Sequence, residues 1–102
     1  MTDWVRVAST NEVRPGERLI VELEDRNVAL FHVDGEYYCI ADVCTHDGGP
    51  VAEGELDGYE IECPRHGARF DIRTGAVLSF PAVVPVPSYE VKVEGPDIYL
   101  LV

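Results

Sequence analysis

Positive charge is scarce in this sequence. The chain has 8 Lys and Arg residues against 19 Asp and Glu residues, which gives a formal net charge of −11. Nucleic acids and anionic membranes are themselves negative, so they would repel such a surface. The charge balance therefore predicts no binding to either, and it favours a partner that presents a basic docking face.

Long apolar runs are also absent. No stretch approaches the roughly 18 apolar residues that a membrane helix needs. The start, Met1-Thr2-Asp3-Trp4, has no basic patch followed by an apolar stretch, so no signal peptide is expected. With 102 residues, 46% of them hydrophobic, the chain has the size and composition of one globular domain, residues 1–102.

Cysteine is sparse, and its number is odd. Three cysteines without a signal peptide argue against a disulfide framework. They suit the reducing cytoplasm, where clustered cysteine and histidine more often bind metal. We therefore expect a cytoplasmic protein, and we examine its Cys and His residues first as metal ligands.

Helical periodicity is missing along the whole chain. Apolar residues mostly alternate with polar ones, and 9 glycines and 7 prolines interrupt them. Asp34-Gly35 is a strong two-residue hairpin signal. The pattern predicts an all-β fold, a small antiparallel sandwich or barrel. The expected strands cover residues 4–7, 19–23, 28–33, 36–41, 59–63, 89–94 and 98–102.

Two glycine-containing segments, Asp42–Gly54 and Pro64–Gly75, have the composition of loops. They flank a short expected strand, Tyr59–Cys63. Loops on either side of a hairpin can meet at one tip of a sheet. We therefore expect the chemistry of this protein in a subdomain of approximately residues 42–75.

Each of these loops offers one thiol and one imidazole. The first carries Cys44-Thr45-His46, the second carries Cys63-Pro64-Arg65-His66, and sixteen residues separate His46 from Cys63. Four such ligands suit either zinc or an iron–sulfur cluster. The Cys-x-His pair is tighter than a usual zinc-finger knuckle. A two-iron cluster can use one pair on each iron, and nearby glycines let backbone amides approach its sulfides.

The two-part motif closely resembles the ligand motif of the Rieske [2Fe–2S] family. The resemblance extends to Ala68-Arg69-Phe70-Asp71 and Thr74-Gly75, and it covers essentially the whole chain. It implies a Rieske-like β fold that binds one [2Fe–2S] cluster between the two loops. It also implies that Cys44 and Cys63 hold one iron through sulfur, and that His46 and His66 hold the other through nitrogen.

The resemblance also indicates a subgroup. High-potential Rieske proteins join the two loops by a disulfide, at positions that Gly49 and Arg65 occupy here. They also place a serine and a tyrosine near the cluster, where this chain has Ala68 and Phe70. Fewer hydrogen-bond donors stabilise the reduced cluster less, so we expect a low potential, around −150 mV.

By this resemblance the chain is a soluble one-electron carrier, a ferredoxin component of a ring-hydroxylating dioxygenase system. It would pass electrons from an NAD(P)H-dependent flavin reductase to a terminal Rieske non-haem iron oxygenase that acts on an aromatic compound. We expect transient partners, a monomer and no catalysis by this chain alone. Two alternatives stay open: the Rieske-like small subunit of a nitrite reductase, and a zinc-stabilised interaction module without redox function.

Several other residues have simpler interpretations. His32 lies on an expected strand, so we expect a packed or surface histidine and not a ligand. Cys39 precedes the first loop and is expected to pack as a small buried apolar residue. Phe80-Pro81-Ala82 resembles a third loop that covers the cluster in this family. Pro64 either shields the cluster or fixes a turn.

Overall fold

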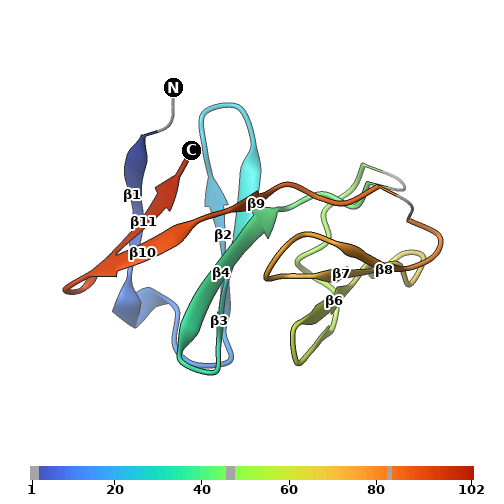
Figure 1. Ribbon diagram of the computed structural model, residues 1–102, viewed down its shortest axis with the longest axis horizontal. Helices are drawn as coiled ribbons and strands as arrows, with labels where there is room; N and C mark the ends of the chain where they lie inside the picture. The colour runs from blue at the N-terminus through green and yellow to red at the C-terminus, as the bar shows by residue number, and fades with distance from the viewer. Residues whose placement is uncertain (1–2, 46–47, 83) are drawn as a thin grey trace.

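The computed structural model describes residues 3–45, 48–82 and 84–102 of the chain. These residues form three antiparallel sheets, which we call A, B and C, and one short 3₁₀ turn at Thr10–Glu12. The sheets follow one another along the long axis of the molecule (Figure 1). The all-β antiparallel architecture predicted from the alternating pattern is confirmed.

Sheet A contains the two ends of the described chain, and sheet B contains the longest hairpin. In sheet A the strand order is β1 (Trp4–Ser9), β11 (Asp97–Leu101) and β10 (Val91–Glu94). In sheet B the order is β2 (Arg18–Glu22), β3 (Asn27–Val33), β4 (Glu36–Ala41) and β9 (Ser88–Tyr89). In sheet C the order is β5 (Leu56–Asp57), β6 (Glu60–Glu62), β7 (Arg69–Asp71) and β8 (Val77–Ser79).

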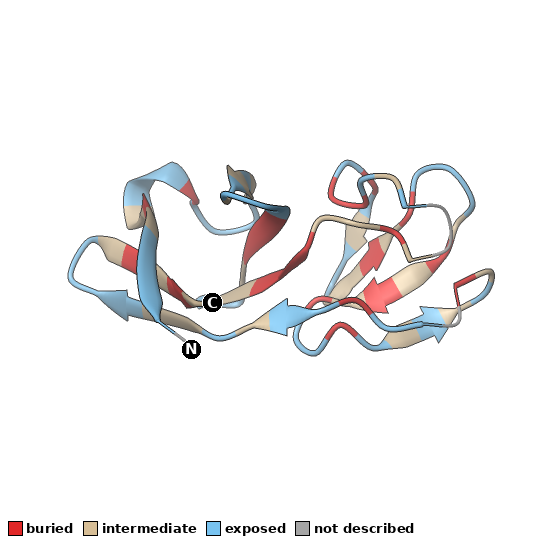
Figure 2. Ribbon diagram, turned by 90° about the horizontal axis from the view of Figure 1, so that it is seen from above, coloured by how far each residue is buried: buried red, intermediate tan, exposed pale blue. Residues whose placement is uncertain are grey.

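Sheet B is the central layer, and buried residues of its strands β3 and β4 lie on both of its faces. Successive side chains of a strand point to opposite faces, so β3 and β4 contribute alternately to two clusters of buried residues. One cluster, between sheets B and A, includes Val28, Leu30, Cys39, Ile98 and Leu100. The other, between sheets B and C, includes Ala29, Phe31, Ile40, Ile61 and Phe70. Figure 2 shows buried segments in both lobes of the molecule.

The hairpin between β3 and β4 forms as its sequence predicts. Asp34 has a φ of 53° and Gly35 a φ of 79°. Two positive φ values at the central positions are the requirement of the tight turn that matches the twist of an antiparallel pair. The turn sets the register, which places Phe31 opposite Tyr38 and Val28 opposite Ala41.

Two expectations about strands were wrong. The segment 64–75 was expected to be a loop, yet it contains β7, because Phe70 is buried opposite Ile61 while Arg69 pairs with Glu62. The segment 89–94 was expected to be one strand. It is divided at Glu90, where the chain passes from β9 in sheet B to β10 in sheet A.

No helix among the described residues is long and apolar enough to cross a membrane.

Candidate metal centre

The first candidate loop begins where β4 ends, and its cysteine points into the protein. Cys44 is completely buried. Its backbone N–H donates to the Gly49 carbonyl at 2.7 Å, and its own carbonyl accepts from the N–H of Gly48 at 2.7 Å. Gly48 has a φ of 77°, a conformation that side chains other than glycine rarely adopt. The loop is therefore closed on itself around the thiol.

The second candidate loop, between β6 and β7, repeats this arrangement. Cys63 is 1% exposed, and its N–H donates to the Ala68 carbonyl at 2.7 Å. Its carbonyl accepts from the N–H of Gly67 at 3.0 Å, and Gly67 has a φ of 78°. In both loops the cysteine is bonded to residues four and five positions later, with glycine at the fourth. Two knuckles of the same shape therefore present the two thiols.

The two thiols share one environment, and the third cysteine does not. Cys44 and Cys63 belong to the buried cluster between sheets B and C, whereas Cys39 belongs to the cluster between sheets B and A. None of these three cysteines, all of them described, forms a disulfide. Burial raises the pKa of the Cys39 thiol to about 12, so it stays protonated at neutral pH. The interpretation of Cys39 as a small buried apolar residue is confirmed.

Of the two candidate histidines, the structure describes His66 only. His66 lies on the second loop, three residues after Cys63, and is exposed. His46 lies outside the described residues. Among the residues that are described, no group of three or more Cys, His, Asp or Glu side chains gathers as a metal site. The geometry of the complete four-ligand set therefore remains a prediction.

His32 has a structural role, as its position on a strand predicts. Its Nδ1 lies 2.8 Å from the Val13 carbonyl, to which a protonated Nδ1 donates. Its ring stacks on Tyr37 with 4.1 Å between the centroids. The imidazole thus packs in the lobe built by sheets A and B, and the cluster to which Cys44 and Cys63 belong does not include it.

Two residues that the sequence analysis missed anchor the first loop. Asp42 Oδ1 accepts from the N–H groups of Val51 at 2.9 Å and Ala52 at 2.8 Å. Arg18, on β2, donates from Nη1 to the carbonyls of Ala52 and Gly54, each at 2.6 Å. Asp42 could have been noticed as the polar residue directly after a strand. No sequence signal connects Arg18 with a loop more than thirty residues away.

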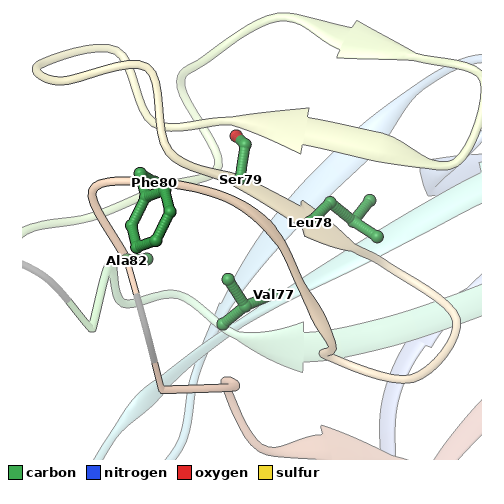
Figure 3. A pocket seen from close by; sticks show the side chains of 5 residues that line it. All are labelled: Val77, Leu78, Ser79, Phe80 and Ala82. Atoms are coloured by element: carbon green, nitrogen blue, oxygen red, sulfur yellow. The ribbon is translucent and has the colours of Figure 1, made fainter.

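A third segment lies against the first loop. The Thr45 hydroxyl donates to the Val84 carbonyl at 2.6 Å, and Ala82 is buried in the same cluster as Cys44. Phe80 is 82% exposed and, with Ala82, lines a shallow apolar hollow beside β8 (Figure 3). These contacts put Ala82 and Val84 next to the first loop. A role of this segment in covering the cluster remains a prediction.

The positions expected to set the potential are apolar. Ala68 and Phe70 are both completely buried. Neither side chain can donate a hydrogen bond, so the reason for expecting a low potential applies to this structure. Pro64 is exposed, and whether it shields the cluster remains a prediction.

The residues present suit a [2Fe–2S] cluster. Cys44 and Cys63 lie among apolar side chains, where burying a thiolate without a partner would cost free energy. Two cysteine thiolates typically bind a metal ion, which would compensate their charge. Imidazole nitrogen is the other ligand of a Rieske centre, and His66 follows Cys63 closely enough to share its loop. The donor set and the repeated loop shape therefore agree with a dinuclear site held between two knuckles.

Comparisons with known proteins point the same way. The model of the family described as Rieske [2Fe-2S] domain matches residues 3–90. The chain is 39% identical over 92 residues to the ferredoxin component of a naphthalene 1,2-dioxygenase system from Pseudomonas aeruginosa, covering 90% of this chain and 88% of that protein.

Solved structures agree with the sequence comparison. The ferredoxin of carbazole 1,9a-dioxygenase from Nocardioides aromaticivorans IC177 is 34% identical and superposes with a TM-score of 0.89, covering 95% of each chain. A chain in a complex of reduced oxygenase and oxidized ferredoxin in carbazole 1,9a-dioxygenase is also 34% identical, with a TM-score of 0.89 over 96% of this chain and 92% of that one.

Proposed function

The chain belongs to the Rieske [2Fe–2S] family, and from this premise we propose that Cys44 and Cys63 bind one iron of its cluster while His46 and His66 bind the other. The observation that carries the proposal is the pair of equivalent knuckles, which direct two buried thiols into the same small core. We also propose that residues 1–102 form a single domain in which residues of approximately 42–75 bind the cluster.

The protein is a one-electron carrier, a ferredoxin component of a multicomponent dioxygenase system and not itself an oxygenase. When bound, the [2Fe–2S] cluster supplies one-electron oxidation and reduction. We propose that the electron comes from an NAD(P)H-dependent flavin reductase and goes to a terminal Rieske non-haem iron oxygenase. The structural relative found in a complex of oxygenase and ferredoxin supports the second half of this route.

The chain's own residues perform two tasks in this function. The buried Cys44 and Cys63 keep water away from the sulfur side of the site. His66 is exposed, so a partner can approach its ring closely. Electron transfer then needs no substrate pocket, because the partner needs only to reach the imidazole edge.

The substrate of the partner oxygenase is an aromatic compound in this proposal. The relatives serve systems named for naphthalene and for carbazole, which are different aromatic molecules. In this proposal the ferredoxin only passes electrons, so its sequence need not select among these substrates. We further propose that the protein acts as a monomer in the cytoplasm, whose reducing conditions suit its three free cysteines.

A reconstituted electron-transfer chain tests the function. The protein, purified anaerobically, is mixed with NADH, a flavin-dependent reductase and the oxygenase of a related carbazole dioxygenase system. We expect product formation that requires this chain, with bleaching of its visible absorption by the reductase and recovery after oxygenase is added. Cys44→Ala should support no turnover. A colourless wild-type protein that holds zinc would contradict the function.

A further inference from the structure

An arginine from the second loop lies across the first loop. Arg65 stands between Cys63 and His66, and its side chain reaches the segment that follows Cys44. Its Nη2 donates to the Pro50 carbonyl at 2.7 Å. The contact joins the outer sides of the two knuckles, at a place where no covalent bond connects them.

Gly49 provides the space that this arginine occupies. A Cβ added at Gly49 would lie 2.7 Å from Arg65 Cζ, 2.8 Å from Nη2 and 3.0 Å from Nε. The planar guanidinium therefore rests directly on the Gly49 backbone. Gly49 is not among the glycines with positive φ, in contrast to its neighbour Gly48. The backbone at 49 would thus accept alanine, and the demand for glycine comes from the arginine.

We propose that Arg65 is a positioning residue, a non-covalent strap that holds the second ligand loop against the first. The inference rests on the proposed function, since it is the cluster between the loops that the strap would protect. Each loop is closed by its own hydrogen bonds around its cysteine. Those bonds each lie within one loop, whereas the contact of Arg65 with Gly49 and Pro50 joins one loop to the other.

The same side chain brings a positive charge next to the site. Arg65 is one of 8 basic residues in a chain of net charge −11, and it adjoins His66. Reduction adds negative charge to the cluster, and a nearby cation favours that change. Arg65 therefore has two separable effects, one on loop geometry and one on potential. Arg65→Gln removes both, while Gly49→Ala displaces the guanidinium and keeps its charge.

Two measurements on the holoprotein separate these effects. The first is the rate at which a chelator removes iron. In Arg65→Gln and in Gly49→Ala we expect it to rise about fivefold, which corresponds to the roughly 1 kcal/mol that a hydrogen bond contributes. The second is the reduction potential, which should fall in Arg65→Gln and change much less in Gly49→Ala. The double variant should release iron no faster than Arg65→Gln alone, because both changes break one contact.

Arg14→Gln is the matched control, since it removes an exposed arginine in the turn before β2, which belongs to neither ligand loop. It should leave the rate of iron release unchanged. Additive effects of Arg65→Gln and Gly49→Ala, or wild-type iron release in Arg65→Gln, would overturn the strap. Hydrogen–deuterium exchange of segment 44–54 can be measured with or without iron, so it tests the strap in either state. A wild type that binds no cluster would refute the proposed function, and the exchange measurement would still test the strap. Equal exchange in wild type and Arg65→Gln would refute the strap.

Discussion

At the scale of single residues, the surroundings of each cysteine decide what it can do. Cys44 and Cys63 each follow a strand end and are enclosed by a hydrogen-bonded knuckle that ends in a glycine of positive φ. Cys39 is equally buried, but it lies in the middle of β4, with its thiol facing sheet A. Burial alone therefore does not make a ligand. Cys44 and Cys63 differ from Cys39 because each lies in a loop that closes around it, and because both belong to one buried cluster.

Replacing the cysteines one at a time tests this distinction. Cys44→Ala should remove the visible chromophore, because one iron loses a thiolate ligand. Cys39→Ser should keep the chromophore and lower the free energy of unfolding by about 1–3 kcal/mol, the cost of burying a hydroxyl in an apolar place. Visible absorption spectra and urea unfolding measure both results. Loss of the cluster in Cys39→Ser would show that the ligand assignment is wrong.

At the scale of elements, the first ligand loop depends on strands that are distant in sequence. Arg18 on β2 holds its far end, and Gly54 brings that end against β6. A Cβ at Gly54 would stand only 1.5 Å from the Glu62 carbonyl oxygen. No rotation of a side chain relieves such an overlap, since the atom it meets is backbone. The glycine is required because loop and strand pass so closely.

Gly54→Ala should therefore lower the free energy of unfolding by more than about 3 kcal/mol and reduce the iron content of the purified protein. The control is Gly58→Ala, in the turn between β5 and β6. A Cβ added at Gly58 would lie in open space, but the φ of 61° is unfavourable for alanine. We therefore expect Gly58→Ala to lower the free energy of unfolding by about 1 kcal/mol and to keep the full iron content. Chemical unfolding and iron analysis provide the comparison. Equal effects of the two substitutions would contradict the close approach.

A second link joins sheet C to the β3–β4 hairpin. Arg73 donates to both carboxylate oxygens of Asp71, at 3.0 and 2.9 Å, and its guanidinium lies 4.2 Å from the centre of the Tyr59 ring. Tyr59 in turn donates its hydroxyl hydrogen to Asp34 at 2.8 Å. The hydrogen bond from Arg73 lowers the pKa of Asp71 below its ordinary value. The ionised form of Asp71 is thus favoured by folding.

This lowered pKa predicts the direction of a pH effect. The stabilisation is complete above the unfolded pKa of Asp71, near 4, and is lost as pH falls through the lower folded value. Asp71→Asn should therefore be less stable than wild type at pH 7, and the difference should shrink below about pH 4. Asp25→Asn, which breaks an exposed pair with Arg26, should have little effect at either pH. Urea unfolding across pH 2.5–7 decides between these outcomes, and a constant difference for Asp71→Asn would contradict the account.

The sequence predicted the elements whose signals are local, and it missed those that depend on distant contacts. The Asp34-Gly35 hairpin and the long strands β3 and β4 were predictable because adjacent residues carry their signals. These signals are the two turn residues and the alternation of apolar and polar residues. The short strands β5, β7 and β8 were not, since two or three residues carry no period and pair only through tertiary contacts. The two candidate ligand loops were recognisable from their motif. The contacts of Arg18 and Arg65 with those loops were not.

At the scale of the whole molecule, the dominant property is negative charge. A net charge of −11 on 102 residues creates a field that acts beyond any single contact. An electron carrier must find its partners quickly and leave them quickly, and long-range attraction speeds the encounter without strengthening the final complex greatly. The acidity therefore suits a reductase or oxygenase with a basic docking face.

Salt tests this use of the charge. Raising the ionic strength from about 0.01 M to 1 M shortens the screening length from about 30 Å to about 3 Å. The second-order rate of reduction by the flavin reductase should fall over this range, by at least about tenfold for a strongly steered encounter. Stopped-flow absorption follows the rate. A rate that does not change with salt would mean that the acidity serves solubility alone.

The central claim is that one iron is held by two cysteine sulfurs and the other by two histidine nitrogens. Electron–nuclear double resonance of the reduced protein, grown with ¹⁵N-labelled histidine, tests it most directly. The account predicts hyperfine coupling from two ¹⁵N nuclei, those of His46 and His66, and the loss of one coupling in His66→Cys. A reduced cluster with no coupling to histidine nitrogen would contradict it.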